Sequence, residues 1–369
     1  MRRFRLLAAG ASALALFVSA CSTGGAPSPT TAAAPPTTAA KPTTAPAISP
    51  AASPSASAAA SPKPAASPAA SPAASPAAAV ASPSPVAAAG GPKPTVKVGS
   101  FGFDESEVLQ ELYAGVLEAN GYTIERHPRL GSREIVEPAL ESGQIDLVPE
   151  YLATLEAFLA GKANTPSKAT SDPATTQTAL QALLTPKNLT VLDFAANAID
   201  TNGFVVTKAT ADKNKLVKMS DLQPVAAQMV LGGPPECPQR PFCLLGLQNT
   251  YKLQFKDFKP LDAGGPLTVT ALDSGDIDIG LLFTTDPNII LKNYVLLEDD
   301  MHLQLADNVA PLVRNAILSA GADAKTLLNS VTAKLTTADL TTMNNDVGNN
   351  HKDAKDVAKA YLQSKGLIK

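Results

Sequence analysis

Residues 139–151 read ALESGQIDLVPEY, and residues 271–283 read ALDSGDIDIGLLF. The two segments share an Ala-Leu pair, an acidic residue before Ser-Gly, an Ile-Asp pair and an aromatic ring at the last position. Each has the pattern of a helix that stops at a Gly and of a strand that follows it. Two copies are too few for a solenoid, which stacks at least three units. The repeat therefore predicts two halves of similar build.

Helices and strands alternate around the first copy. Residues 95–100 have the alternating pattern of a strand, and residues 104–120 have the single apolar stripe of a helix. Asp104 is the predicted N-cap of that helix. A second strand (122–130), a second helix (133–142) and a third strand (145–151) follow. This order predicts a parallel sheet with helices packed against it.

Tyr151 and Phe283 come at the ends of the two repeated strands. Ligands of open α/β sheets bind outside the carboxyl ends of strands, so we expect both rings in one cleft between two lobes. Residues 95–200 together with 308–369 are predicted to form lobe I, and residues 201–307 to form lobe II. The chain then crosses twice between the lobes, which gives a hinge. The predicted fold is α/β, with a mainly parallel sheet flanked by helices in each lobe.

The N-terminal part of the chain has the pattern of an exported lipoprotein. Three arginines precede a short apolar run at 6–17, as in a signal peptide over residues 1–20. Small residues directly before Cys21 resemble the lipobox of bacterial lipoproteins, in which the cysteine is acylated; an ordinary signal peptide with a chance cysteine is the alternative. Residues 21–94 are then a lipidated Cys followed by a stalk rich in Ala, Pro, Ser and Thr, with too few large apolar side chains to fold. We expect a protein anchored by lipid to the outer face of the cytoplasmic membrane, at the cell surface or in the periplasm.

The net charge and the cysteines narrow the class of protein further. The formal net charge of the 369 residues is −3, with no basic run, which argues against a nucleic-acid partner. Cys237 and Cys243 lie in ECPQRPFC, a spacing that indicates a local disulfide in an exported protein. A metal site is the competing interpretation, but none of the three histidines lies near these cysteines in sequence. We therefore expect no metal and no cofactor.

Catalysis has little support in the sequence. We find no Gly-rich phosphate loop, no nucleophile elbow and no cluster of metal ligands. His127 and His302 have no evident nucleophile beside them in sequence. The chain is therefore expected to bind a ligand rather than to transform it.

The folded part of the chain resembles the substrate-binding proteins of glycine betaine/choline/carnitine ABC transporters. The matching segments occur in family order: VKVGSFGFDESEVLQELYAGVLEANGY (96–122), LGSREIVEPALESGQIDLVPEYLAT (130–154), SDL (220–222), ECPQRP (236–241), ALDSGDIDIGLLFTTD (271–286), LEDD (297–300) and PLVR (311–314). The resemblance implies the two-lobed periplasmic-binding-protein fold of class II. It also implies capture of a quaternary ammonium ligand for an ABC permease and, through the permease, its ATPase.

The chain departs from the family pattern at the repeated strands. It has Tyr151-Leu152-Ala153-Thr154 where related members usually read Tyr-Thr-Gly-Thr, and Phe283 where they often have Tyr. The chain also contains no Trp. These differences leave the choice among glycine betaine, choline, carnitine and proline betaine open.

Aromatic side chains are the expected binding groups. A quaternary ammonium group cannot donate a conventional hydrogen bond, and it is recognised by aromatic faces, each worth about 0.5 to 2 kcal/mol. The candidate rings are Phe103, Tyr151, Phe204 and Phe283. Phe103 follows the first predicted strand, as expected for a cleft residue. The alternative for each ring is a place in the core.

Polar anchors complete the predicted site. A carboxylate-bearing ligand suits the fork of an Arg, and Arg240, between the two cysteines, is the candidate that the resemblance supports. A surface salt bridge is the alternative for Arg240. The candidates for hydrogen bonds are Asn202, Thr284, Thr285 and Asp286. Asp286 can instead contact a cation directly or cap a helix before Pro287. Asp146 and Asp278, inside the repeats, are expected to bind the backbone.

These features together predict the solute-binding component of an ABC importer. The alternative is a ligand-sensing or receptor lipoprotein with the same fold that does not feed a transporter. We expect a monomer, because neither lobe has an obvious self-pairing stripe.

Overall fold

The computed structural model describes residues 93–369. The predicted signal peptide, Cys21 and all but the last two residues of the predicted stalk lie outside the described residues. None of the helices in residues 93–369 has the length and apolarity needed to cross a bilayer. Lys93, which the prediction placed in the stalk, forms an ion pair with Asp323 and so is held on the folded part.

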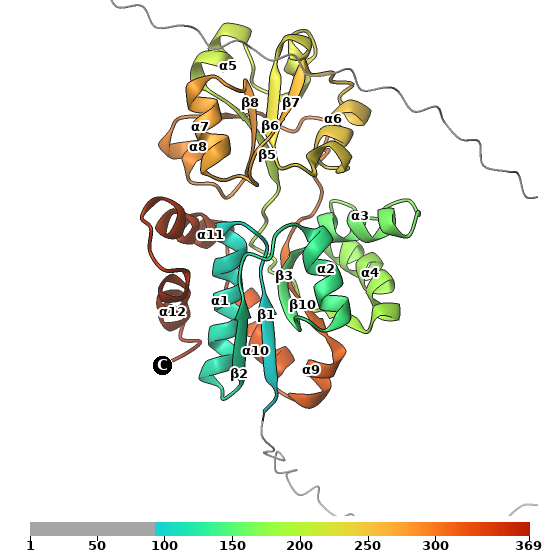
Figure 1. Cartoon of the computed structure of the whole chain (residues 1–369), viewed down its shortest axis with the longest axis vertical. Coiled ribbons are helices and arrows are strands. Elements are labelled where there is room, and N and C mark those ends of the chain that lie inside the picture. Colours follow the sequence, from blue (N-terminus) through green and yellow to red (C-terminus); the bar gives the residue numbers. More distant parts are fainter. Residues whose placement is uncertain (1–92) are drawn as a thin grey trace, which may run out of the picture. The chain divides into compact units, whose positions relative to one another are not determined.

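The first sheet, with its helices, forms lobe I (Figure 1). Its strand order is β2-β1-β3-β10-β4. The elements before the first crossing are β1 (Thr95–Gly99), α1 (Asp104–Ala119), β2 (Thr123–His127), α2 (Arg133–Ser142), β3 (Leu147–Tyr151), α3 (Leu152–Lys162), α4 (Pro173–Leu184) and β4 (Leu189–Val191). After the second crossing come β10 (Val309–Arg314), α9 (Asn315–Ala320), α10 (Ala324–Thr332), α11 (Thr337–Asn344) and α12 (Ala354–Ser364).

The second sheet, with its helices, forms lobe II (Figure 1). Its strand order is β7-β6-β8-β5-β9. The elements are β5 (Asn202–Val206), α5 (Lys208–Asn214), β6 (Val230–Gly233), α6 (Leu244–Thr250), β7 (Asp257–Pro260), α7 (Pro266–Ser274), β8 (Ile279–Phe283), α8 (Asn288–Leu291) and β9 (Val295–Leu296). The two-lobed α/β fold predicted from the sequence is confirmed.

The two sheets have the same topology and are mainly parallel, as predicted, with one antiparallel strand in each. In each sheet the first three strands are parallel, whereas the fourth runs antiparallel to both of its neighbours. The fourth strands, β10 and β5, are those by which the chain enters a lobe from the other one. They start beside the carboxyl ends of β3 and β8, because Val309 pairs with Tyr151 and Asn202 pairs with Phe283. Entry from that edge makes their direction opposite to that of the parallel strands.

The repeat that opened the sequence occupies equivalent places in both lobes. Gly143 and Gly275 end α2 and α7 with φ of 78° and 76°, a conformation that favours glycine. Asp146 and Asp278 each accept a hydrogen bond from the backbone of the adjacent parallel strand, at 3.0 Å from the nitrogen of Lys97 and 2.8 Å from that of Val230. Both aspartates therefore bind backbone, as the sequence predicts.

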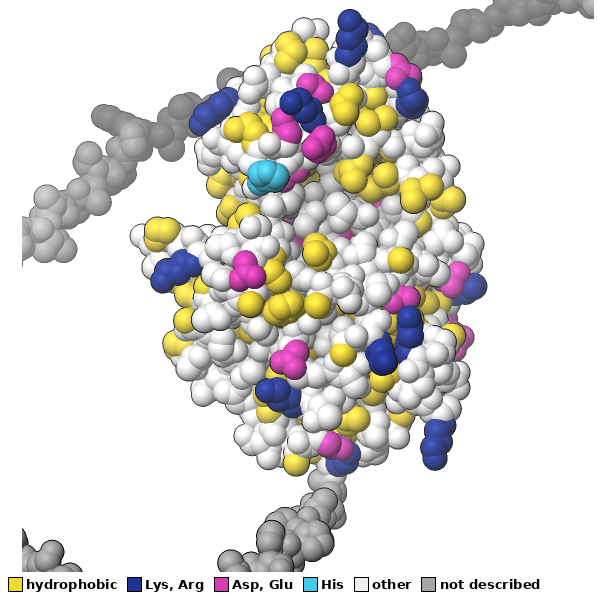
Figure 2. Space-filling model, turned by 180° about the vertical axis from the view of Figure 1, so that it is seen from behind, with side chains coloured by type: hydrophobic (Ala, Val, Ile, Leu, Met, Phe, Trp, Pro, Cys, Tyr) yellow, Lys and Arg dark blue, Asp and Glu magenta, His cyan; other side chains and the backbone are white. Residues whose placement is uncertain are grey.

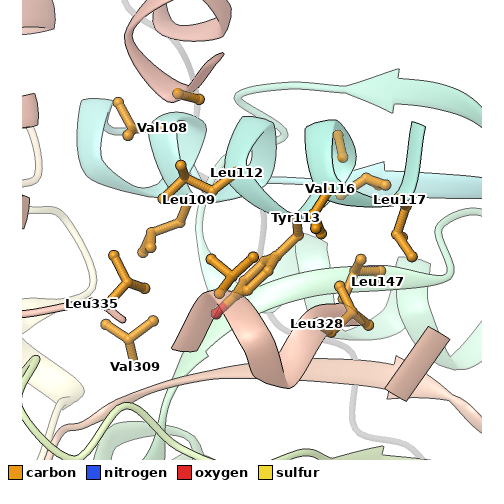
Figure 3. Packing of buried hydrophobic residues seen from close by; sticks show 14 of the residues in the cluster. Val108, Leu109, Leu112, Tyr113, Val116, Leu117, Leu147, Val309, Leu328 and Leu335 are labelled. Atoms are coloured by element: carbon orange, nitrogen blue, oxygen red, sulfur yellow. The ribbon is translucent and has the colours of Figure 1, made fainter. Parts of the chain in front are cut away.

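Alternate residues of each strand pack on opposite faces of the sheet. In lobe I, Leu147 contacts the core formed with α1, α10 and α12, whereas Val148 contacts the core formed with α2, α3 and α4. Figure 3 shows the α1 side of this core, where the predicted stripe is fully or almost fully buried. The stripe consists of Val108, Leu109, Leu112, Val116 and Leu117. This packing fixes the N-terminus of α1, directly after Phe103 of the cleft described below.

The start of α1 differs from the prediction. Phe103, not Asp104, is the N-cap, and no side chain caps the helix. The carboxylate of Asp104 instead forms an ion pair with Arg129, 2.5 Å away. The helix begins at Asp104 because β1 ends at Gly99 and a short turn places Phe103 at the sheet edge.

Charged side chains of both signs are interspersed over the face shown in Figure 2, which carries no continuous basic patch.

Candidate functional site

A cleft with a volume of about 470 Å³ lies where the two lobes meet. Lobe I contributes residues that follow β1, β2 and β3, and lobe II contributes the end of β8 and the loop that contains the two cysteines. This is the edge at which ligands of open α/β sheets bind. The cleft is therefore the candidate ligand site.

Three aromatic rings from both lobes meet in this cleft. Tyr151 is the last residue of β3, Phe283 is the last residue of β8, and Phe103 precedes α1. The ring centroid of Phe103 lies 6.2 Å from that of Tyr151 and 5.0 Å from that of Phe283. The rings of the two repeats thus share one cavity, with Phe103 between them. Such a group of aromatic faces can hold an apolar or cationic ligand.

Buried carboxylates lie next to the rings. Asp200 precedes β5 and Asp307 precedes β10, so each of the two crossings between the lobes places one Asp in the cleft. Asp307 accepts hydrogen bonds from the backbone nitrogen of Thr154, at 2.8 Å, and from its hydroxyl. Burial raises the pKa of Asp307 to about 6. Burial and the charge of Glu105 raise the pKa of Asp200 as well.

Two arginines line the cleft. The guanidinium of Arg133 forms two hydrogen bonds with Glu150, of 2.9 and 2.7 Å, and lies 5.0 Å from the Phe101 ring centroid. Arg240 lies 4.8 Å from the ring centroid of Phe158 and pairs with Glu134 at 2.8 Å. Burial and the charge of Arg133 lower the pKa of Arg240. Because Arg133 is already neutralised by a buried partner, Arg240 is the more available group for an anion.

The loop around Arg240 is fixed by covalent and steric constraints. Cys237 and Cys243 form a disulfide. A side chain at Gly246 would come within 1.8 Å of the carbonyl oxygen of Pro241, so the loop packs directly on the α6 backbone. The carbonyl of Phe242 accepts a hydrogen bond of 3.0 Å from the amide of Asn202. The loop therefore presents Arg240 and Phe242 to the cleft in a defined position.

Five of the predicted site residues line the cleft. They are Phe103, Tyr151, Asn202, Arg240 and Phe283. Their contacts with a ligand stay predictions.

Four predicted site residues lie elsewhere, and one of them, Thr285, is buried and donates a hydrogen bond of 2.6 Å to Glu105. Phe204 is 1% exposed and belongs to the core of lobe II, because its position on β5 faces the same side as Leu281. The hydroxyl of Thr284 accepts from the backbone nitrogen of Thr201 and donates to Asp200, each at 3.0 Å. Asp286 lines a neighbouring groove and accepts from the backbone nitrogen of Asn288 at 2.7 Å, near the start of α8. Pro287, not Asp286, is the N-cap of α8, so the capping alternative for Asp286 is wrong.

Sequence reasoning missed several residues of the cleft. They are Phe101, Arg133, Phe158, Asp200, Phe242 and Asp307. For the two aspartates the sequence offered one indication, because each strand that enters a lobe from the other lobe begins two residues after an Asp. The other residues required knowledge of which loops meet.

Comparisons with known proteins agree with this arrangement. The family model described as the substrate-binding domain of an ABC-type glycine betaine transport system matches residues 94–364. The carnitine transport binding protein of Listeria monocytogenes is 24% identical over 277 residues, which cover 74% of this chain and 88% of that protein. The glycine betaine-binding protein of Escherichia coli (strain K12) is 26% identical over 282 residues, which cover 74% and 92%.

A solved structure supports the fold. The crystal structure of a glycine betaine/carnitine/choline ABC transporter protein superposes with a TM-score of 0.59 at 24% identity, covering 74% of this chain and all of that one. The matched family consists of extracytoplasmic solute-binding components of ABC transporters and not of enzymes. Because the family model spans most of the chain, the protein belongs to the family of substrate-binding domains of ABC-type glycine betaine transport systems.

Proposed function

We propose that the protein captures a quaternary ammonium osmolyte between its lobes and delivers it to an ABC permease. The candidate ligands are glycine betaine, carnitine, choline and proline betaine. The observation that carries the proposal is the meeting of Phe103, Tyr151 and Phe283 in one cleft, with rings from both lobes.

The electrostatics of the cleft favour a cation at the rings. Among the described residues that line the cleft there is no Lys, and Asp200 and Asp307 lie on its wall. A methylated ammonium needs no hydrogen-bond acceptor, but it gains from aromatic faces and from negative charge nearby. Three ring contacts at about 0.5 to 2 kcal/mol each supply part of the roughly 8 kcal/mol that a micromolar affinity requires. Burial and a second anchor supply the remainder.

Arg240 is the proposed second anchor. Glycine betaine and carnitine carry a carboxylate, for which a guanidinium fork is the best-matched partner in proteins. The relatives named above are a carnitine transport binding protein and a glycine betaine-binding protein. Choline lacks the carboxylate and would use the rings and the acidic wall alone.

Delivery to the permease requires retention at the membrane. We propose that the chain is exported, acylated at Cys21 and joined to the membrane by its Ala/Pro-rich stalk, as a monomer. Closure of the lobes over the ligand would then create the form that the permease recognises. Replacement of Cys21 by Ser is expected to release the exported protein from the membrane fraction.

Calorimetry tests the proposal. The wild-type chain is expected to bind at least one of the four osmolytes with micromolar or better affinity and to bind none of a set of plain amino acids. Tyr151→Leu and Phe283→Leu keep apolar bulk but remove a π face, so each is expected to weaken binding about three- to thirtyfold. Phe255→Leu is the matched control, since Phe255 is a half-buried ring of lobe II outside the cleft. Full affinity in both cleft variants would contradict the ring-based site.

A further inference from the structure

Glu105 is a buried carboxylate behind the ring cluster. It is the second residue of α1 and is 3% exposed. Its Oε1 accepts a hydrogen bond from the hydroxyl of Tyr151 at 2.7 Å. Its Oε2 accepts from the hydroxyl of Thr285 at 2.6 Å and from the amide of Asn344 at 2.7 Å. All three partners are neutral donors, and no Lys or Arg of the described residues forms an ion pair with Glu105.

The three donors belong to different parts of the molecule. Tyr151 ends β3 of lobe I, Thr285 follows β8 of lobe II, and Asn344 ends α11. The bond from Thr285 joins residues that are 180 positions apart and links the two lobes directly. Thr285 is itself held by its backbone nitrogen, which donates to Asp200 at 3.0 Å. One carboxylate therefore contacts both a ring of the candidate site and the opposite lobe.

A buried negative charge without a positive partner is costly to maintain. Burial accordingly raises the pKa of Glu105. Neighbouring charges do not relieve this cost: Asp200 is a second buried carboxylate, Glu150 on β3 is paired with Arg133, and Asp104 on α1 is paired with Arg129. Glu105 lines a neighbouring groove that also contains Arg129 and Lys292, neither of which forms an ion pair with it. On the side of the cleft, a positive charge acts on Glu105 through Tyr151, whose ring lines the cleft and whose hydroxyl bonds to the carboxylate.

We infer that Glu105 is a positioning residue for cation recognition, acting on the bound ammonium group through the Tyr151 ring and coupling that charge to lobe closure through Thr285. A phenol that donates its proton to a carboxylate carries more electron density on its ring face, which strengthens attraction for a cation. The same carboxylate holds Thr285 only when the lobes are together. This inference rests on the proposed function and assigns the ligand's positive charge, rather than its methyl groups, as the feature that closes the protein.

Linked protonation follows from this role. In the free protein burial raises the pKa of Glu105 above the ordinary value of a carboxyl group. A bound cation favours the charged carboxylate and lowers the pKa again. Ligand affinity should therefore rise as pH increases through the pKa of the free protein, and binding should release protons. Asp200 titrates in the same network and contributes to the same trend, so a Glu105 variant should reduce the proton release rather than abolish it.

The test compares a cation with its uncharged isostere. Choline and its analogue with a tert-butyl group in place of the trimethylammonium group are titrated into the full chain, together with glycine betaine and its tert-butyl analogue. Glu105→Gln preserves the shape of the side chain but removes its charge. The hydroxyls of Tyr151 and Thr285 can donate hydrogen bonds to the new amide or accept them from it. We expect the preference of Glu105→Gln for the cation over the isostere to fall about tenfold, the order expected for one charge acting across a protein interior. A merely structural role would weaken both members of a pair alike.

Two further variants separate the parts of the role. Tyr151→Phe removes only the hydroxyl and should reduce the preference for the cation over the isostere. In a double variant with Glu105→Gln, it should cause little further reduction of that preference. Thr285→Val removes the hydroxyl that joins Glu105 to lobe II, so it should weaken binding of the cation more than binding of the isostere. Calorimetry in two buffers of different ionisation enthalpy measures the released protons, which should decrease in Glu105→Gln.

The outcomes are distinguishable. Unchanged cation preference and unchanged proton release in Glu105→Gln would overturn the inference and leave the proposed function intact. If Glu105→Gln fails to fold, an unchanged preference in Tyr151→Phe overturns the inference in the same way. A wild-type chain that binds no member of either pair would overturn the proposed function and this inference with it.

Discussion

At the scale of single residues, the cleft separates two kinds of charge. Phe103, Tyr151 and Phe283 share their part of the cavity with Asp200, whereas Arg240 lies on the disulfide loop over Phe158. A ligand with a positive and a negative end can satisfy both. Among residues 93–369, Arg240 has one ion-pair partner, Glu134. The side chain of Glu134 is 49% exposed, so exchange of that partner for a ligand carboxylate costs little.

Arg240→Ala should therefore change ligand choice rather than abolish binding. Affinity for glycine betaine and carnitine should fall by about ten- to hundredfold, the range for loss of a hydrogen bond to a charged group. Affinity for choline should stay within about twofold, because choline has no carboxylate to lose a partner. Calorimetry with the three ligands checks this, and Arg240→Lys should recover only part of the loss, since a Lys cannot form the two-pronged contact. Equal losses for choline and glycine betaine would remove Arg240 from ligand recognition.

At the scale of elements, the loop between Cys237 and Cys243 decides where Arg240 and Phe242 lie. The disulfide and the contact with Gly246 hold the loop against α6, and Asn202 and Gln304 both donate to the carbonyl of Phe242. The loop is thus tied to β5 and to the segment before β10, the two segments by which the chain crosses. Its position depends on the closed covalent ring and on this network together.

Replacement of both Cys237 and Cys243 by Ser is expected to lower the free energy of unfolding by about 2 to 3 kcal/mol, the loop-closure value for so short a ring. Urea denaturation measures this change. Affinity for glycine betaine should also fall, because Arg240 then samples more conformations before binding. Treatment of the wild-type chain with a reductant should reproduce both effects and should have none on the double Ser variant. Wild-type affinity in the double variant would show that the hydrogen bonds alone place the loop.

At the scale of the whole molecule, both crossings place an acidic residue at the cleft, and one carboxylate of α1 links the lobes. Asp200 and Asp307 precede the crossing strands, and Glu105 bonds to Thr285 across the gap. The candidate ligand site and the contacts between the lobes therefore share the same few side chains. Separation of the lobes would break the contact between Phe103 and Phe283 and the bond to Thr285 at once.

Spin labels on opposite lobes should detect this closure. Lys359 on α12 and Lys213 on α5 are exposed and lie on different lobes. The distance between labels at these positions should become shorter and more narrowly distributed when glycine betaine or choline is added. A control pair at Lys359 and Lys325, both in lobe I, should not change. In Thr285→Val the distribution should remain broad with ligand; an unchanged distribution in the wild type would argue against closure.

Much of the fold could be predicted because its signals are local. Helix stripes, Gly stops and the repeated strand ends depend on residues a few positions apart, and they correctly indicated two α/β lobes with Tyr151 and Phe283 at strand ends. The antiparallel entry of β5 and β10 was missed, because a strand's direction in a sheet is not encoded in its own alternation.

The sequence by itself determined the two-lobed architecture and the cysteine pair, through short-range patterns and the order of segments along the chain, and its resemblance to known substrate-binding proteins indicated the class of protein. Only the tertiary structure decided which side chains form the cleft. Phe204 lies in the core because packing decides which face of β5 it occupies. Glu105 bonds to both lobes because residues 105, 285 and 344 meet only after the chain has crossed twice between them. Contacts over such separations depend on how the lobes pack, which no local pattern specifies.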